Sequence, residues 1–455
     1  MTGVEVAGQN LANVNTTGYS RQRVNIQTGP DITTGIGSEG TGANAVSIQQ
    51  MVNTLLNSQV QSQQSTSGYW NGQQSALQSA QNGLNEFLNG SASTSSTTST
   101  TSDSSTGLAS QLNGLFSAFS AVATSPTSTT ARQALIGQAQ TLATTFNNVN
   151  TQLGSLKTAL NSSLNDNVDS ANKLLSGIAT LNQQISAAEF NGGTANDLRD
   201  EREQDLENLS QLTNVTTSTE TNGTVDVSIG GQALVTGYKV ADTLQTYDAG
   251  GGQMLVQTAT GGVPLTLSGG SMQGTIDARD GTLATLQNNV NTLAGTLITQ
   301  VNSIHNGGYS LTGSTGANFF NGTDAATITV NAALAGNPDL IQTSGSATAA
   351  GDNSVVLQLA QLGSTAQAAL GNQTFNDNYD ATVAALGDSL QTANTQVTNQ
   401  SLVAQMLTTQ RGSISGVSVD EEMTNLLSFQ RAYEASAKLV STVDTLMGDT
   451  LAMKT

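Results

Sequence analysis

The chain has 455 residues and carries 13 basic against 32 acidic side chains, which gives a formal net charge of −19. Scarce Lys and Arg and a pI near 4.1 argue against nucleic-acid binding, which depends on neutralising phosphates. No apolar run approaches the ~20 residues needed to cross a bilayer, so we expect no membrane insertion. Cysteine is absent and His305 is the single histidine, which excludes disulfides, thiolate sites and histidine clusters. We therefore expect no cofactor, no metal site and no enzymatic activity.

The N-terminal region predicts a short helix, a turn and a pair of strands. Residues 10–28, NLANVNTTGYSRQRVNIQT, start as a helical piece, and Gly18 marks a turn because glycine reaches positive φ without steric cost. Val24 and Ile26 alternate with polar neighbours and predict a half-exposed strand. A glycine-rich hairpin region follows, and a second strand is expected around residues 46–48.

Helical apolar spacing dominates the chain from Met51 to residue 212. Apart from the helix at Met51, the spacing predicts helices over 108–125, 131–190 and 196–212. The first of these three ends at Ser125-Pro126 because proline breaks a helix interior. Residues 91–106 are a Ser/Thr tract that cannot form a core, so we expect a flexible surface loop there.

The pattern changes at Thr213. Residues 213–276 alternate apolar and polar positions between Gly and Asn turns, which predicts a small all-β domain. The later ranges predict helix over about 281–304, a loop-and-strand excursion over 306–350, and helices over 353–372, 376–410 and 418–453.

Helices on both sides of the β segment favour nested domains, each built from an N-side and a C-side part. The predicted fold is α+β, elongated and multidomain. Its expected parts are a coiled-coil-like terminal domain (1–62 plus 412–455), a helical-bundle domain (63–212 plus 277–411, with the excursion 306–350), and an inserted small all-β outer domain (213–276).

The C-terminal segment has the strongest apolar pattern. Ser418 and Glu421 fit a capping box at its start, and apolar residues then recur in two neighbouring stripes. The assembly residues that we predict on this helix are Ser418, Val419, Glu421, Met423, Leu426, Leu427, Phe429, Tyr433, Leu439, Val440, Val443, Leu446, Met447 and Leu451. Such a face is either the core side of a helix in a monomeric bundle or a surface buried against other copies. The N-terminal helix is short enough to cover only part of it, which favours other copies.

Both ends of the chain carry motifs of a known family. The N-terminal stretches NLAN (10–13) and NTTGYSRQ (15–22) and the C-terminal stretch 415–447 resemble the signatures of the axial proteins of the bacterial flagellum, namely its rod, hook and hook-associated proteins. Residues 123–147, 197–215 and 270–320 are similar to the hook-associated proteins at the hook–filament junction, in particular the first of the two. The N-terminal residues that this resemblance implies in assembly are Asn10, Leu11, Ala12, Asn13, Asn15, Gly18, Tyr19 and Arg21.

The resemblance implies a structural, self-assembling role. Its subunits would polymerise on the distal end of the hook, as an adaptor between hook and filament, after secretion through the flagellar export apparatus. The implied partners are copies of the chain itself, the hook protein, the second junction protein and an export chaperone at the C-terminal helix. The alternatives are another axial protein, such as the second junction protein or a flagellin-like subunit, and a secreted glycan-binding adhesin.

Two groups of polar residues are candidates for chemical sites. Residues 197–207 form the densest charge cluster; Arg199 and Glu203 lie four positions apart, so we interpret the cluster as a solvated helix face with ion pairs rather than a catalytic carboxylate group. His305 ends a predicted helix, and we expect it to cap that helix through the dipole rather than to bind a ligand.

Overall fold

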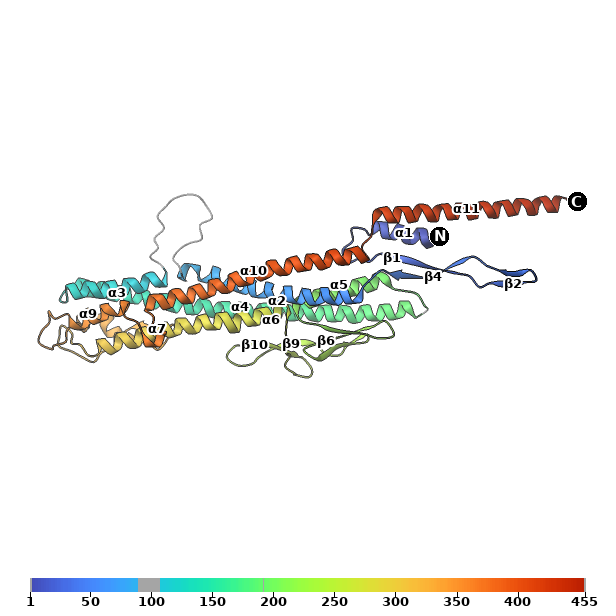
Figure 1. Ribbon diagram of the computed structural model, residues 1–455. Helices are drawn as coiled ribbons and strands as arrows, with labels where there is room; N and C mark the ends of the chain where they lie inside the picture. Colours follow the sequence, from blue (N-terminus) through green and yellow to red (C-terminus); the bar gives the residue numbers. More distant parts are fainter. Residues whose placement is uncertain (1, 89–106, 191, 454–455) are drawn as a thin grey trace.

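The protein is an elongated rod of parallel and antiparallel helices with small antiparallel sheets along its side (Figure 1). The computed structural model describes residues 2–88, 107–190 and 192–453. The Ser/Thr tract 91–106 lies outside the described residues. The fold is thus α+β and elongated, as the sequence predicts.

The elements follow one another in long runs. The helices are α1 (Thr2–Ala12), α2 (Thr54–Leu88), α3 (Leu108–Thr124), α4 (Thr129–Glu189), α5 (Asn196–Leu212), α6 (Gly270–Asp277), η1 (Ala278–Leu283, a π-helix), α7 (Ala284–His305), α8 (Ala332–Gly336), η2 (Pro338–Leu340), α9 (Ser354–Gln361), η3 (Leu362–Ser364), η4 (Ala368–Leu370), α10 (Phe375–Ser415) and α11 (Val419–Ala452). The strands are β1 (Gln22–Thr28), β2 (Ile32–Thr34), β3 (Gly37–Glu39), β4 (Ala43–Gln50), β5 (Thr216–Thr219), β6 (Val225–Ile229), β7 (Gln232–Thr236), β8 (Lys239–Val240), β9 (Leu244–Asp248), β10 (Met254–Thr258), β11 (Phe320–Asn321) and β12 (Thr329–Val330).

Both ends of the chain lie at the same end of the rod. There, α1 packs beside the first turns of α11, and the β1–β4 hairpin projects in the same direction as α11 (Figure 1). Val24 faces Ile48 in the antiparallel pair, and the register shifts between Asn25 and Ile26. These are the two strands that the alternating pattern predicts.

Two buried clusters hold the body together. The first lies among α2, α3, the first part of α4, α7, α9 and α10, and includes the fully buried Phe119 and Phe319, whose rings are 5.3 Å apart. The second joins the later part of α4, α5 and α6 to strands β6, β7, β9 and β10. Leu175 of α4, Leu209 of α5 and Val227 of β6 belong to this second cluster. Its strands therefore pack directly on helices, with β5-β6-β7-β8 as one sheet and β9-β10 as a hairpin.

Three boundaries differ from the sequence prediction. Helix begins at Gly270 and continues through η1 into α7, whereas strand character was expected to residue 276. Leu265 and Leu267 belong to no strand; only Pro264 forms an isolated bridge, and proline has no amide hydrogen for a ladder. The expected helix over 353–372 is α9 followed by two short 3-10 turns.

His305 does not cap its helix as expected. It is fully buried, its Nδ1 lies 2.7 Å from the carbonyl oxygen of Ala317, and its Nε2 accepts from the amide of Gln342 at 3.0 Å. With Nε2 as acceptor, Nδ1 carries the proton and the ring is neutral. Burial is the main cause that lowers the pKa of His305 to about 4, so the ring bonds two points of the 306–350 excursion instead of presenting a charge to the helix dipole.

Candidate functional site

Asn10 is the centre of the N-terminal motif. Its side chain is fully buried, and its Nδ2 donates to the carbonyl of Gln22 at 2.8 Å and to Glu422 at 3.1 Å. Its Oδ1 accepts from the Tyr19 hydroxyl at 2.8 Å and from the Gln22 amide at 2.9 Å. A buried amide with four partners is fully satisfied and fixes its neighbours, so Asn10 joins α1, the following turn, β1 and α11.

Gly18 and Asn13 form the turn that brings Tyr19 back to Asn10. Gly18 has a φ of +83°, as the turn prediction requires. Asn13 accepts from the Thr16 hydroxyl at 3.1 Å through its side chain, and its backbone carbonyl accepts from the Thr16 amide. Burial and the nearby carboxylates of Asp197, Asp200 and Glu422 raise the pKa of Tyr19 to about 12, so its hydroxyl stays a donor at neutral pH.

Arg21 ties the N-terminal segment to the start of α11. Its Nη1 lies 2.6 Å from Glu421, and its Nε donates to Glu422 at 2.8 Å. Glu422 is only 3% exposed, so Arg21 and Asn10 balance a carboxylate that has left water. The predicted capping box is wrong: Ser418 makes no side-chain cap bond, and the carboxylate of Glu421 pairs with Arg21 instead of reaching back to the N-cap.

Helix α1 covers only the first turns of α11. Phe429 lies against the backbone of Gly3, and a Cβ built on Gly3 would stand 2.9 Å from that ring, so the close approach requires glycine. Of the predicted N-terminal residues, Leu11 is half-buried, while Ala12 and Asn15 are exposed. On α11, Leu426 and Phe429 are half-buried in this contact.

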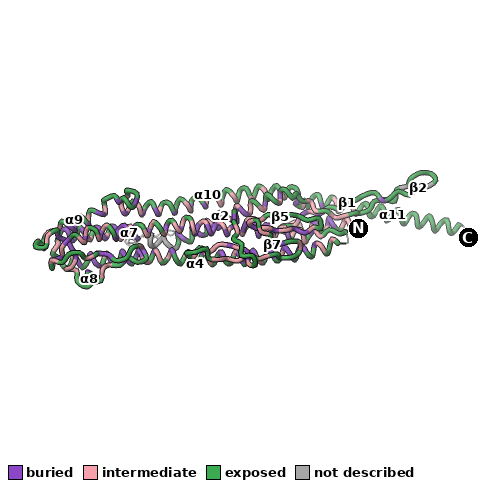
Figure 2. The backbone as a smooth tube through the Cα atoms, turned by 90° about the horizontal axis from the view of Figure 1, so that it is seen from below, coloured by how far each residue is buried: buried purple, intermediate pink, exposed green. Residues whose placement is uncertain are grey.

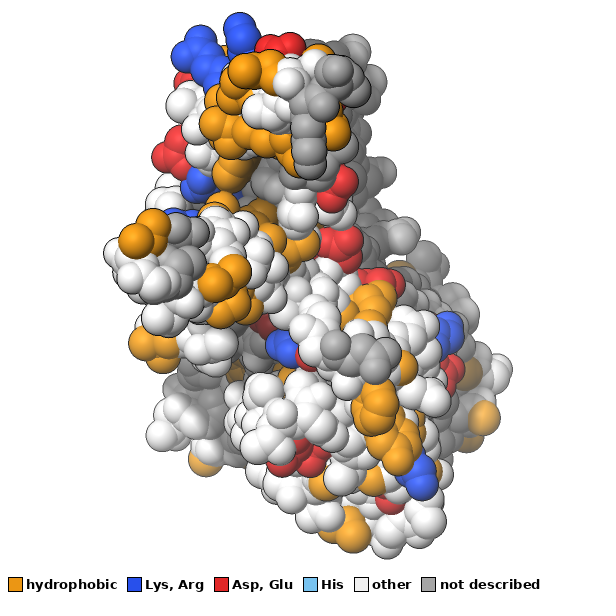
Figure 3. Space-filling model, turned by 90° about the vertical axis from the view of Figure 1, so that its right-hand side faces the viewer, with side chains coloured by type: hydrophobic (Ala, Val, Ile, Leu, Met, Phe, Trp, Pro, Cys, Tyr) orange, Lys and Arg blue, Asp and Glu red, His pale blue; other side chains and the backbone are white. Residues whose placement is uncertain are grey.

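Beyond α1, the apolar face of α11 is uncovered by any residue that the structure describes. Every residue from Gln430 to Ala452 is exposed, and Leu439 and Leu451 are each 68% exposed (Figure 2). Figure 3, which views this end of the rod, shows hydrophobic side chains gathered over the end of α11. The predicted assembly residues that are large, apolar and exposed here are Val419, Met423, Leu427, Tyr433, Leu439, Val440, Val443, Leu446, Met447 and Leu451. Burying each is worth about 1.5–3 kcal/mol, so this face favours a partner.

The charge cluster on α5 is not a solvated face. Asp200 accepts from the amide and the hydroxyl of Ser20, at 2.8 and 2.7 Å, and Asp197 accepts from Gln22 at 2.8 Å. Arg199 pairs with Glu189 at 2.7 Å rather than with Glu203. Asp197 and Asp200 therefore hold the N-terminal segment to the body instead of facing solvent.

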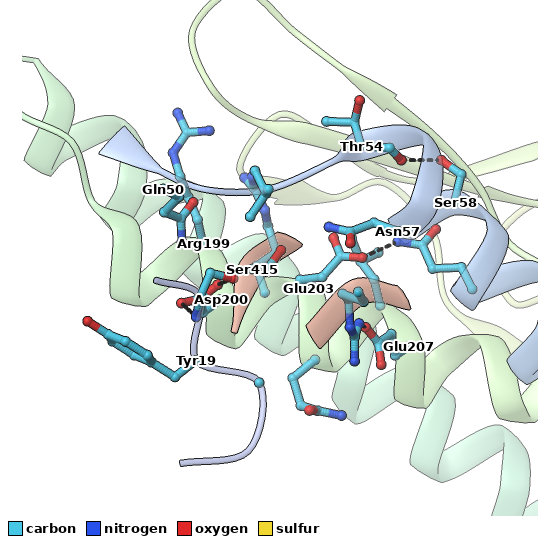
Figure 4. A pocket seen from close by; sticks show the side chains of 18 of the residues that line it. Tyr19, Gln50, Thr54, Asn57, Ser58, Arg199, Asp200, Glu203, Glu207 and Ser415 are labelled. Carbon is cyan, nitrogen blue, oxygen red and sulfur yellow. Dashed lines mark hydrogen bonds and ion pairs between the residues drawn. The ribbon is translucent and has the colours of Figure 1, made fainter. Parts of the chain in front are cut away.

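Two other members of the cluster, Glu207 and Glu203, bond to neighbouring helices. We use the word joint for these contacts of α5 together with those of Asn10 and Arg21. Glu207, 5% exposed, pairs with Arg411 of α10, and Glu203 accepts from Gln61 of α2 at 2.9 Å. A cavity of about 310 Å³ lies here between α5, the start of α2 and the end of α10 (Figure 4). Burial raises the pKa of Asp200 and of Glu203, and protein hydrogen bonds partly offset it.

The described residues contain no group of His, Cys, Asp and Glu suited to hold a metal ion. In the same part of the chain, no helix has the length and apolarity to span a membrane. The geometry at this end of the rod is that of a docking joint and an uncovered helix face.

Comparison with known proteins agrees with the terminal motifs. The family model "Flagellar hook-associated protein FlgK helical domain" matches residues 94–320, and "Flagellar basal body rod FlgEFG protein C-terminal" matches residues 410–453. Flagellar hook-associated protein 1 of Bacillus subtilis (strain 168) is 27% identical over 98% of this chain and 94% of its own length. Its namesake in Escherichia coli (strain K12) is 24% identical over 97% of this chain and 95% of its own length.

The chain belongs to the flagellar hook-associated protein family.

A solved structure shares the fold of this hook-associated protein. The flagellar hook junction protein FlgK from Burkholderia pseudomallei superposes with a TM-score of 0.65 at 18% identity, covering 78% of this chain and 100% of that one. The family places the protein in the flagellum. The C-terminal match spans the end of α10 and the whole of α11, where the uncovered apolar face lies.

Sequence reasoning missed several residues of the joint. Gln22, Ser20, Asp200, Arg411 and Gly3 were not predicted, although all contact a terminal segment or hold one in place. The dense charges at 197–207 were a usable signal, because so many carboxylates on one helix in a chain with few charges need partners. Nothing in the local sequence marks Gly3.

Proposed function

We propose that this chain is a structural subunit that assembles with copies of itself at the distal end of the hook, as an adaptor between hook and filament. The observation that carries the proposal is the apolar face of α11 from residue 430 to 452, which no described part of the chain covers. Membership of the hook-associated family supports the location.

In this proposal the paired α1 and α11 lie toward the axis of a tube and the helical body lies outside. Each subunit leaves a face of α11 that no described residue of its own covers, and neighbouring subunits cover it. The joint at Asn10, Arg21 and Asp200 sets the angle between the terminal pair and the body. A polar joint of this kind can be adjusted without opening either buried core, which suits a part that adapts a curved hook to a stiff filament.

We further propose the partners and route of the subunit. The hook protein lies below it and the second junction protein above it, outside the cell. Before assembly, an export chaperone binds the face of α11 by taking an amphipathic helix into a groove. This accounts for how so apolar a helix reaches the flagellar export apparatus without aggregating.

The test is replacement of the chromosomal copy in a motile host, with electron microscopy of hooks and filaments. Deletion of the gene is expected to leave hooks without filaments. Removal of residues 418–455 is expected to give the same result. Filaments and swimming in cells with that truncation would refute the assembly role; loss of the hooks themselves would instead favour another axial role.

A matched pair of variants separates the apolar face from the helix as such. Leu439→Gln with Val443→Gln changes the apolar side, and Ser441→Gln with Thr445→Gln changes the opposite side at the same spacing. We expect the first pair to reduce the number of filament-bearing cells at least tenfold and the second to leave it within twofold. Equal effects of the two pairs would contradict the proposal.

A further inference from the structure

A groove opens between the terminal helices and the hairpin. It encloses about 600 Å³, and its lining includes Val6 of α1, Val24 and Ile26 of β1, and Phe429 of α11. Figure 1 shows the hairpin running below α1 and α11 on this side. We call this space the hairpin groove.

The hairpin contributes an apolar row that the chain leaves open. Val24 faces Ile48 across the strands, and Ile26, two positions along β1, lies on the same face as Val24 and is 50% exposed. Val46 on β4 is also exposed. A two-stranded hairpin is marginal in water by itself, so an occupant of this groove would stabilise it.

The charges that line the hairpin groove bear on which segment it can bind. Its lining includes Arg21, Arg23 and Glu422, and Arg21 already pairs with Glu421 and Glu422. Arg23 is exposed and forms no ion pair with any residue the structure describes, so it is the charge that the groove offers to an occupant. Residues 439–452, the last described part of α11, carry Asp444 and Asp449 as their only charges. That segment is part of the uncovered apolar face of α11, so it offers the apolar groove an apolar surface and offers Arg23 an opposite charge.

A subunit cannot fill its own groove with this segment. Phe429 and Val443 are 14 residues apart on one continuous helix, which places them roughly 21 Å apart along the axis. The contact must come from another molecule, and it joins two different patches. Such a heterologous contact does not close on itself as a two-fold pair does; it extends into a ring or a helical tube.

We propose that the hairpin groove of one subunit receives the apolar face of residues 439–452 of α11 from a second copy of this chain. The proposal rests on self-assembly as proposed above, and it names which two surfaces meet.

Cysteine pairs test the contact cleanly, because the chain has no cysteine of its own. A full-length Ile26→Cys, Val443→Cys variant replaces the chromosomal copy, and isolated flagella are oxidised and separated without reductant. We expect subunit dimers and larger species, with peptides linked between positions 26 and 443 identified by mass spectrometry. The control is Ile26→Cys with Ser441→Cys, whose second site lies on the opposite side of α11. It should give at least tenfold less product.

The outcomes separate this inference from the proposed function. Absence of the 26–443 link, or equal linking in both variants, in flagella that carry filaments would overturn the inference and leave the assembly role standing. A second measurement covers the case in which the cysteine variants do not assemble. Arg23→Asp and Asp444→Arg should each reduce swimming several-fold, and the two together should restore it. Failure of the double variant to restore swimming would also overturn the inference.

Discussion

The Nε of Arg21 donates to Oε1 of Glu422 over 2.8 Å, although 401 residues separate them in the chain. The bond joins the two terminal segments, because Arg21 follows α1 and Glu422 lies in the first turn of α11. Asn10 adds a second bond to the same carboxylate. The segment that follows α1 and the first turn of α11 therefore hold each other in place within one molecule.

Replacing Arg21 by Ala should loosen the pairing of α1 with α11. The change leaves Glu422 buried with Asn10 as its remaining partner; since Arg21 is partly exposed, we expect a loss of about 1–3 kcal/mol. Hydrogen exchange of residues 2–12 and 419–429 in the monomer measures it. Arg23→Ala, two positions further along the chain in β1, is the control and should change exchange little. Equal protection in the two variants would show that the ion pair does not hold the helices together.

A side chain at position 3 should separate the same helices by a steric route. Gly3→Val places a Cβ 2.9 Å from the Phe429 ring, whereas Gly8→Val in the same helix meets nothing within 4 Å. We expect Gly3→Val to cost about 1–3 kcal/mol, the usual range for overpacking, and Gly8→Val to be near neutral. Exchange rates of the α1 amides in both variants decide it, and a neutral Gly3→Val would mean that Phe429 can move away freely.

Asp200→Ala should release the N-terminal segment from the body. Two hydrogen bonds from Ser20 lose their acceptor, which at about 1.5–3 kcal/mol for a bond to a charged group is enough to free the turn. The readout is faster exchange at residues 16–22 with unchanged exchange in α4. Glu201→Ala, an exposed neighbour on the same helix, is the control. If both variants behave alike, Asp200 does not anchor the segment.

Stability should fall as the pH drops from about 6.5 to about 4, because His305 is buried and neutral. Its pKa in the folded protein, about 4, lies below the ordinary 6.5, so the unfolded chain takes up the proton first as the pH falls. This lowers the free energy of unfolding by about 3 kcal/mol at the low end of the range. The carboxyls of Asp200 and Glu203, whose folded pKa values are raised, act in the opposite sense.

Thermal unfolding at pH 7 and pH 4.5 measures this dependence. In His305→Gln the fall in Tm between these two values should be much smaller than in the unchanged chain, because the single histidine is gone. Parallel pH dependence in both proteins would contradict the assignment.

Regular elements were predictable where local signals were strong. Helix 196–212 was predicted to its observed bounds, and the strands at Val24 and Ile48 follow from simple alternation. The apolar stripe of α11 also follows from spacing, because helical periodicity alone fixes which residues share a face; that no described residue covers it does not.

The missed features depend on distant partners. Glu421 and Ser418 fit a capping box locally, but Arg21, 400 residues away, takes the carboxylate. Arg199 could pair with Glu203 on its own helix, yet Glu189 at the end of α4 holds it. In each case a local rule gave a satisfactory partner and tertiary packing supplied another one, which no single stretch of sequence records.

Helix α4 has a mechanical consequence for the whole subunit. It runs unbroken for 61 residues, roughly 92 Å, and contributes to both buried clusters. Force along the rod axis is therefore carried by one continuous helix rather than by an interface between the two buried clusters. We expect strain at the end that carries α1 and α11 to change the angle at the joint near α5 rather than to bend the helical body.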